Sequence, residues 1–218
     1  MDCRSTEKRQ WIIEKYNVTP VAHIQLLAGQ TKHSDAGKII QNDYYIFEAI
    51  DKSNEAKEII QCGMGAARDF LRLLNHKGLP IFNPLHRGEL VGGDENGQAR
   101  AGGDVRRTET NWNPIARQLY NAIMWIIIII DAKPDTPIFE IRDKVYRYKV
   151  REPFASQIRA VNTIIRKNLP NSTLTEAINN LRAENDVRDD VCQFDLLINS
   201  INNMTNRDGV PLDIQSLF

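Results

Sequence analysis

The chain has 218 residues, of which 42% are hydrophobic and 26% charged, and its 28 basic side chains balance 28 acidic ones. This composition suits one domain, or one domain with a second lobe, around a sizeable core, and it excludes wholesale disorder. The zero net charge excludes a uniformly basic protein that coats nucleic acid, although a local basic face remains open.

The cysteines and the hydropathy of the sequence indicate in which cellular compartment we expect the protein. Cys3, Cys62 and Cys192 are odd in number and far apart, and no CxxC pair occurs, so we expect free thiols in a reducing compartment. The N-terminus lacks the apolar run of a signal peptide, and the longest apolar run, 122–130, is far shorter than the ~20 residues that span a bilayer. We therefore predict a soluble, cytoplasmic protein with no membrane partner.

The N-terminal segment predicts two short helices followed by a polar loop. Residues 5–16 begin with hydroxyl N-cap candidates and would turn Trp11 towards the core. Pro20 is placed to open a second helix, which Gly29 would end. The pair has the spacing of a helix-turn-helix, but the second helix carries no Arg or Lys to read a DNA groove. We expect a helical hairpin that packs on the core.

Residues 43–85 carry the most continuous run of structural signals. The segments YYIFEAI (44–50) and KEIIQ (57–61) are rich in aromatic and β-branched residues and predict the two strands of a hairpin. A glycine turn then opens a helix that should lie on the hairpin and end at Gly78. Its apolar residues recur at helical spacing, namely Ala67, Phe70, Leu71 and Leu74.

The turn into this helix, CGMGAAR, is a candidate phosphate site. Gly63 and Gly65 would expose backbone N–H groups at a helix N-terminus, and Arg68 would add a charged donor. The dinucleotide pattern GxGxxG is incomplete, because Arg68 stands where the third glycine belongs. The favoured alternative is a tight turn that brings the helix close to the hairpin.

Metal-ligating and catalytic residues give weaker signals. Asp43 with Glu55 and Lys57 has the residue types of a metal-dependent hydrolytic centre, but Glu55 falls in a predicted turn. The Cys and His residues form no pairs two to four residues apart, the usual spacing of structural zinc ligands. We therefore predict no metal and no cofactor, we nominate no catalytic residue, and whether the protein is an enzyme stays open.

Glycine is concentrated between residues 88 and 103, where no periodic apolar pattern is present. Such a stretch predicts a flexible loop, here over 89–113, that separates two lobes. The predicted organisation has an N-terminal lobe of helices and a β-hairpin–helix unit over 1–88, a helical bundle over 114–208, and a tail over 209–218.

The second lobe predicts about five helices. Asn113-Pro114 marks the start of a helix whose second half is almost wholly apolar, so it should be central and buried. Residues 138–150 fit a helix better than the alternative β-hairpin. Pro153 should open the next helix, with Phe154 on its core face.

Further along this lobe, Thr173 and Glu176 match a capping box at the start of another helix. The last helix is predicted over 187–201, where apolar residues recur in one line.

The clearest electrostatic signal also lies in the second lobe, where Tyr146, Tyr148 and Phe154 interleave with cations. Such a segment can neutralise phosphates and stack bases. Alternatively, nearby acids, including Asp189 and Asp190, neutralise it within the protein. The cations are Arg142, Lys144, Arg147, Lys149, Arg151, Arg159, Arg166 and Lys167.

We therefore predict an α+β fold, predominantly α, with a small N-terminal β-hairpin–helix unit packed with a C-terminal helical bundle. The leading hypothesis is a non-catalytic accessory protein of a nucleic-acid-linked complex, which binds nucleic acid or an acidic protein surface through the basic segment. One alternative is an enzyme acting on a phosphate-containing substrate, such as a nucleotide or nucleic acid, at the CGMGAAR turn. The other is a protein–protein assembly module, with a protein partner or a second copy of the chain.

Overall fold

The computed structural model describes residues 1–86, 111–133, 136–206 and 208–218. Within them the fold is α+β and predominantly α, as predicted. The chain divides into two compact units, which we call the sheet unit (Met1–Pro84 with Lys133–Phe139) and the helical unit (Leu85–Ala132 with Glu140–Phe218). Most of the loop predicted at 89–113 lies outside the described residues. No helix in the described ranges is long and apolar enough to cross a membrane.

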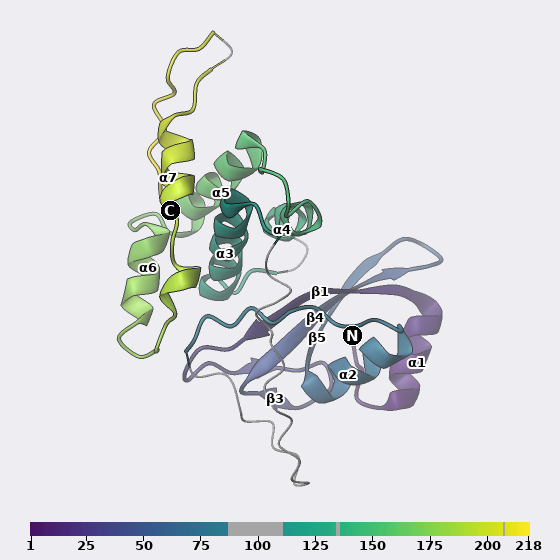
Figure 1. Cartoon of the computed structure of the whole chain (residues 1–218). Coiled ribbons are helices and arrows are strands. Elements are labelled where there is room, and N and C mark those ends of the chain that lie inside the picture. Colours follow the sequence, from purple (N-terminus) through teal and green to yellow (C-terminus); the bar gives the residue numbers. More distant parts are fainter. Residues whose placement is uncertain (87–110, 134–135, 207) are drawn as a thin grey trace. The chain divides into compact units, whose positions relative to one another are not determined.

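The sheet unit is a three-stranded antiparallel sheet in the order β1-β4-β5, with a helix before it and a helix after it (Figure 1). A small two-stranded hairpin, β2–β3, lies between the first two strands of this sheet along the chain. The elements are α1 (Thr6–Lys15), β1 (Tyr16–Gln25), β2 (Lys32–His33), β3 (Ile39–Ile40), β4 (Asp43–Asp51), β5 (Lys57–Gly63) and α2 (Met64–Leu73).

The hairpin and helix predicted within residues 43–85 are confirmed. Tyr45, Phe47 and Ala49 of β4 alternate onto one face of the sheet, because successive strand residues point to opposite faces. That face forms one buried cluster with residues of α1 and α2, including Phe70. Helix α2 ends at Leu73, well before the predicted stop at Gly78.

The second helix predicted near the N-terminus is wrong, because residues 16–25 form β1. Val18, Thr19 and Val21 are β-branched, which suits a pleated strand, and β1 pairs with β4 along its length. Pro20 is tolerated because β1 is an outer strand of the sheet, and the register shifts between Pro20 and Ala22. The inward orientation predicted for Trp11 is also wrong, since this side chain is 52% exposed.

Each outer strand of the sheet is covered by another chain segment at one point. Beside β1, the Phe82 N–H donates to the His23 carbonyl (2.9 Å), and the Phe82 carbonyl accepts from the Gln25 N–H (3.0 Å). Beside β5, Oδ2 of Asp35 accepts the Gln61 N–H (2.6 Å), and the Asp35 N–H donates to the Gln61 carbonyl (2.8 Å). These bonds occupy backbone groups that an edge strand otherwise leaves open.

The helical unit is arranged around α3, which is buried as predicted. Oδ1 of Asn113 accepts the N–H groups of Ile115 (2.9 Å) and Ala116 (3.2 Å), and Pro114 takes the first helical position. Helix α3 contacts α5, α6 and α7. The helices of this unit are α3 (Pro114–Ile129), α4 (Pro137–Arg147, whose first turn groups with the sheet unit), α5 (Ala155–Asn168), α6 (Leu174–Leu181) and α7 (Asp195–Asn202), with a 3-10 turn at Asp189–Val191.

The helix preferred for 138–150 and the capping box of Thr173 and Glu176 are confirmed. The single long helix predicted over 187–201 is wrong, because the chain forms only the 3-10 turn before α7 begins at Asp195. Phe154 also differs from its predicted place in the core. It is the residue before α5, in an extended conformation, so its side chain does not follow the apolar face of the helix.

Candidate functional site

The end of α4 and the residues before α5 present cationic and aromatic side chains to solvent. Lys144, Arg147 and Arg151 are exposed, and none of them forms an ion pair with another described residue. Tyr148 is 53% exposed and Phe154 is 76% exposed. We call these five residues the basic–aromatic surface.

The turn that carries this surface is held against the start of α3. The Arg151 N–H donates to the Tyr148 carbonyl (2.8 Å), and the Asn113 N–H donates to the Lys149 carbonyl (2.8 Å). Nζ of Lys149 lies 5.5 Å from the ring centroid of Trp112 and 5.1 Å from that of Tyr146, which is cation–π geometry. Lys149, predicted to bind a partner, is thus engaged within the protein and anchors the turn.

Arg142 is also predicted as a binding cation, but its side chain is 4% exposed. Nη1 donates to Oδ1 of Asp143 (2.7 Å), while Nε has no hydrogen-bond partner in the described part of the chain. The guanidinium lies 6.0 Å from the Tyr146 ring centroid. Beside it, burial raises the pKa of the Tyr120 hydroxyl. Arg142 is therefore a buried residue that packs against Tyr146 and is not available to bind a partner.

Three further predicted cations, Arg159, Arg166 and Lys167, are exposed along α5 and form no ion pair with described residues. The acids expected to neutralise the segment engage other arginines. Asp189 pairs with Arg182 (2.8 Å), and Asp190 pairs with Arg188 (2.6 Å). These two acids therefore do not pair with the cations of the basic–aromatic surface.

The sheet unit contains a second candidate, a cavity of about 450 Å³ at the N-terminus of α2. Four residues of the predicted CGMGAAR turn line this cavity, namely Gly63, Met64, Gly65 and Ala66. The N-cap residue Gly63 has no side chain to accept from the first N–H groups, and the first turn of α2 carries no acid. Both features favour an anion at this end of the helix.

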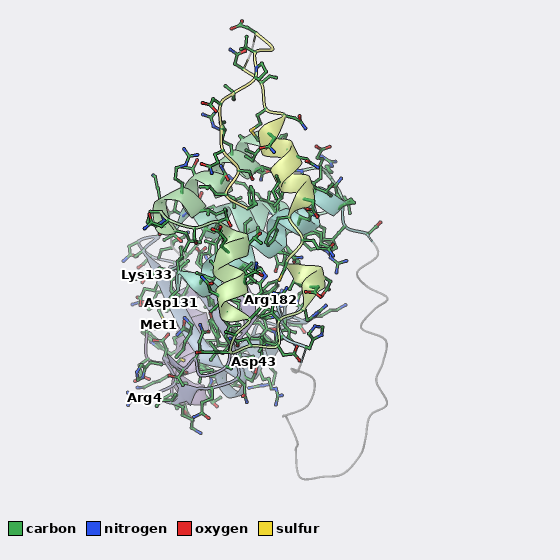
Figure 2. The ribbon with its side chains drawn as sticks, turned by 90° about the vertical axis from the view of Figure 1, so that its left-hand side faces the viewer. Met1, Arg4, Asp43, Asp131, Lys133 and Arg182 are labelled. Carbon is green, nitrogen blue, oxygen red and sulfur yellow. The ribbon has the colours of Figure 1, made fainter. Side chains whose placement is uncertain are left out.

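Three cationic residues line the same cavity, namely Arg4, Arg9 and Lys38. Arg9 is fixed, because its Nε bonds to Oδ2 of Asp69 (2.7 Å) and its Nη1 donates to the Cys3 carbonyl (2.7 Å). Arg4 (Figure 2) and Lys38 are exposed. Arg68, predicted for this role, is exposed on α2 but does not line the cavity.

A carboxylate, that of Asp43 (Figure 2), lines the cavity as well. Its Oδ2 lies 2.6 Å from Nε2 of His23, and Nδ1 of His23 lies 3.3 Å from the Leu79 carbonyl oxygen. The imidazole also stacks on the Tyr45 ring, with centroids 4.2 Å apart. Both ring nitrogens of His23 therefore face oxygen atoms, which fixes the orientation of the imidazole beside Asp43.

The hydrolytic centre considered at Asp43 does not assemble. Tyr44 pairs with Gly63 and Ile50 pairs with Lys57, so Asp43 and Lys57 stand at opposite ends of the β4–β5 ladder. Among the described residues, no group of three or more His, Cys, Asp or Glu side chains is placed to hold a metal ion.

Two thiols lie in the core beside the cavity. Cys3 and Cys62 are fully buried in the same cluster, next in sequence to the lining residues Arg4 and Gly63. The hydrogen bond between the two thiols, together with burial, raises the pKa of Cys62. This thiol is therefore held protonated and is a poor nucleophile.

Comparison with known proteins places the chain in a family. A family model described as "Uncharacterised conserved protein UCP028583" matches residues 1–203, which include both candidate sites. The chain belongs to this family. No curated protein and no solved structure matches the chain. The description of the family states no activity, so the chemistry of the two sites is the basis for a function.

Sequence reasoning missed the cationic lining of the cavity. Arg4 precedes α1, Arg9 lies within α1, and Lys38 lies between β2 and β3. No local pattern links these positions to the glycine turn, because only the tertiary fold brings them to the start of α2. The one available signal is the pair of glycines between a strand and a helix.

Proposed function

We propose that the protein is an accessory subunit that binds nucleic acid through its basic–aromatic surface. The observation that carries the proposal is the presence of three exposed cations that form no ion pair with the described residues, beside two exposed aromatic rings. Unpaired Lys and Arg side chains can displace the counterions of a phosphate backbone, which is the main source of affinity for nucleic acids. An accessory role implies a protein partner, and free cysteines fit a cytoplasmic location.

The structural support of the turn favours this proposal over a merely solvated face. Contacts of Lys149 and Asn113 hold the turn in place, so its backbone does not have to become ordered when a partner binds. A preorganised surface loses less conformational entropy on binding. The exposed cations of α5 extend the same charge along the chain, giving a long phosphate backbone further contacts.

Changing Lys144, Arg147 and Arg151 together to glutamate should abolish most of the binding. Each phosphate contact contributes about 0.7 to the slope of log K against log salt for a single strand and about 0.9 for a duplex. Loss of three contacts should therefore flatten the slope by about 2 and weaken binding about a hundredfold near 0.1 M salt. Fluorescence anisotropy with labelled DNA and RNA across a salt series measures both quantities.

The matched control is the triple change of Arg68, Lys77 and Lys133 to glutamate, which alters net charge equally at exposed positions elsewhere. It should retain most of the affinity. Equal weakening by the two triple variants would show that only net charge matters and would contradict the proposed surface. Absence of binding by the native protein at low salt would refute the proposal altogether.

A second candidate function is supported by the cavity at α2: an enzyme acting on a small phosphate-containing substrate. The open N–H groups after Gly63 and the side chains of Arg4 and Lys38 would receive the phosphate. Asp43, oriented by His23, would supply a carboxylate beside the bound group. The reaction itself is left unspecified by these residues.

Thermal shift measurements with inorganic phosphate and nucleotides test this second candidate. A ligand that binds only the folded state should raise the Tm in a concentration-dependent way. At a hundred times its Kd it adds about 2.7 kcal/mol to the free energy of unfolding. Arg4→Glu with Lys38→Glu should remove the shift. Arg68→Glu is the matched control, because this residue is on the same helix but outside the cavity lining. A shift that survives in the double variant, or its absence in the native protein, would count against the site.

A further inference from the structure

Two aromatic side chains of the helical unit are largely exposed to solvent. Phe154 is 76% exposed and Tyr148 is 53% exposed. Phe154 occupies the N-cap of α5, where a side-chain oxygen normally accepts from the helix, and a phenyl ring has no acceptor to offer. The Phe154 N–H is satisfied instead by Oε1 of Gln157 (2.9 Å). The ring therefore serves neither the cap nor the core.

Both rings are mounted on an ordered segment. Tyr148 continues the last turn of α4, with its N–H donating to the Lys144 carbonyl (3.1 Å). Phe154 begins α5, with its carbonyl accepting from the Gln157 N–H (2.8 Å). The two residues are six apart in sequence, so their Cα atoms are at most about 22 Å from each other. One short oligonucleotide can reach both.

We propose that Tyr148 and Phe154 stack on unpaired bases, and that the partner of the basic–aromatic surface is single-stranded nucleic acid. This inference rests on the proposed nucleic-acid binding and adds the class of partner. Lys144, Arg147 and Arg151 contact the phosphates, while the two rings take the faces of bases. In a duplex those faces are covered by neighbouring base pairs, so the rings have nothing to stack on. Because every base offers a π face, binding tolerates many sequences.

The test compares three labelled ligands by fluorescence anisotropy: a single strand, the same sequence as a duplex, and polyglutamate. The strand has about 16 nucleotides, which is the upper end of usual site sizes. The native protein should bind the single strand most tightly. Tyr148→Ala and Phe154→Ala should each weaken single-strand binding by about five- to a hundredfold, the range expected for loss of one stacked base. Neither change should alter the salt slope, because the phosphate contacts remain.

Matched variants separate stacking from general apolar contact. Phe154→Tyr and Tyr148→Phe keep the rings and should bind like the native protein, whereas Phe154→Leu keeps an apolar side chain and should lose affinity. Both rings are largely exposed, so none of these variants should change the Tm. Ring protons of Phe154 should also shift upfield in NMR spectra when the single strand is added.

Equal affinity for duplex, native-like binding by Phe154→Leu, or preference for polyglutamate would each overturn the inference. In the first two cases the proposed function survives as long as the Lys144, Arg147 and Arg151 variant still loses binding. If the native protein binds neither nucleic acid form, the proposed function and the inference fall together.

Discussion

Replacing Trp125 with alanine is expected to lower the free energy of unfolding by about 3–5 kcal/mol, as for other buried aromatic residues. Trp125 is fully buried in α3, the helix around which the helical unit is arranged. Its Nε1–H donates to the Val191 carbonyl (3.0 Å), which holds the 3-10 turn against α3. The substitution therefore leaves both a large void and an unpartnered carbonyl. Urea denaturation followed by circular dichroism measures the effect.

Two controls separate these contributions. Trp125→Phe keeps most of the volume but removes the donor, so we expect a loss of only about 1–2 kcal/mol. Trp11→Ala removes an indole that is 52% exposed and should cost less than about 1 kcal/mol. If Trp125→Phe were as damaging as Trp125→Ala, the hydrogen bond to Val191 and not the packing would dominate.

Replacing Arg9 with alanine should destabilise the sheet unit by about 2–3 kcal/mol, because it removes the more buried of the two arginines that pair with a partly buried carboxylate. The side chains of Arg9 and Asp69 are 11% and 15% exposed. Arg9 also donates to the Cys3 carbonyl and to the Thr6 hydroxyl, so it ties the N-terminal segment to α1 and α2. Arg72→Ala is the matched control. Arg72 bonds to the same carboxylate but is 65% exposed, so its loss should cost less than about 1 kcal/mol. Equal losses for the two variants would contradict the role of burial.

The same carboxylate predicts how stability depends on pH. The hydrogen bond from Arg72, and then that from Arg9, lower the pKa of Asp69 in the folded protein. Its contribution is therefore present above the unfolded pKa of about 3.9 and is lost as the pH falls through the lower folded value. The difference in urea midpoint between the native protein and Asp69→Asn should shrink below about pH 4. A difference that stays constant down to pH 3 would argue against this linkage.

Local signals were sufficient for several elements. The aromatic and β-branched runs of β4 and β5, the Asn113-Pro114 start of α3 and the capping box of α6 each act within a few residues, and all form as predicted. In contrast, the sequence predicts a helix where β1 forms, because Pro20 is tolerated both at a helix start and in an outer strand. Pairing with β4, a non-local interaction, decides between the two.

The candidate sites depended even more on tertiary structure. Helical spacing assigned Phe154 to the core, but its N-cap position rotates the side chain out of that pattern. Charge alone groups Arg142 and Lys149 with the exposed cations, although Arg142 lies over one aromatic ring and Lys149 over two. The cavity lining combines residues from three separate segments, so no spacing rule could have assembled it.

The covered strands of the sheet unit have a consequence for self-association. A three-stranded sheet has two edge strands. An uncovered edge strand can pair with the same strand of a second molecule, which is a first step towards aggregation. Here Asp35 hydrogen-bonds to the backbone of β5 at Gln61, and Phe82 hydrogen-bonds to the backbone of β1 on the opposite edge. The charged residues Lys57 and Glu58 at the start of β5 further discourage such pairing. At these points the edge hydrogen-bonding groups are already used, so pairing of the same strands between copies is disfavoured there.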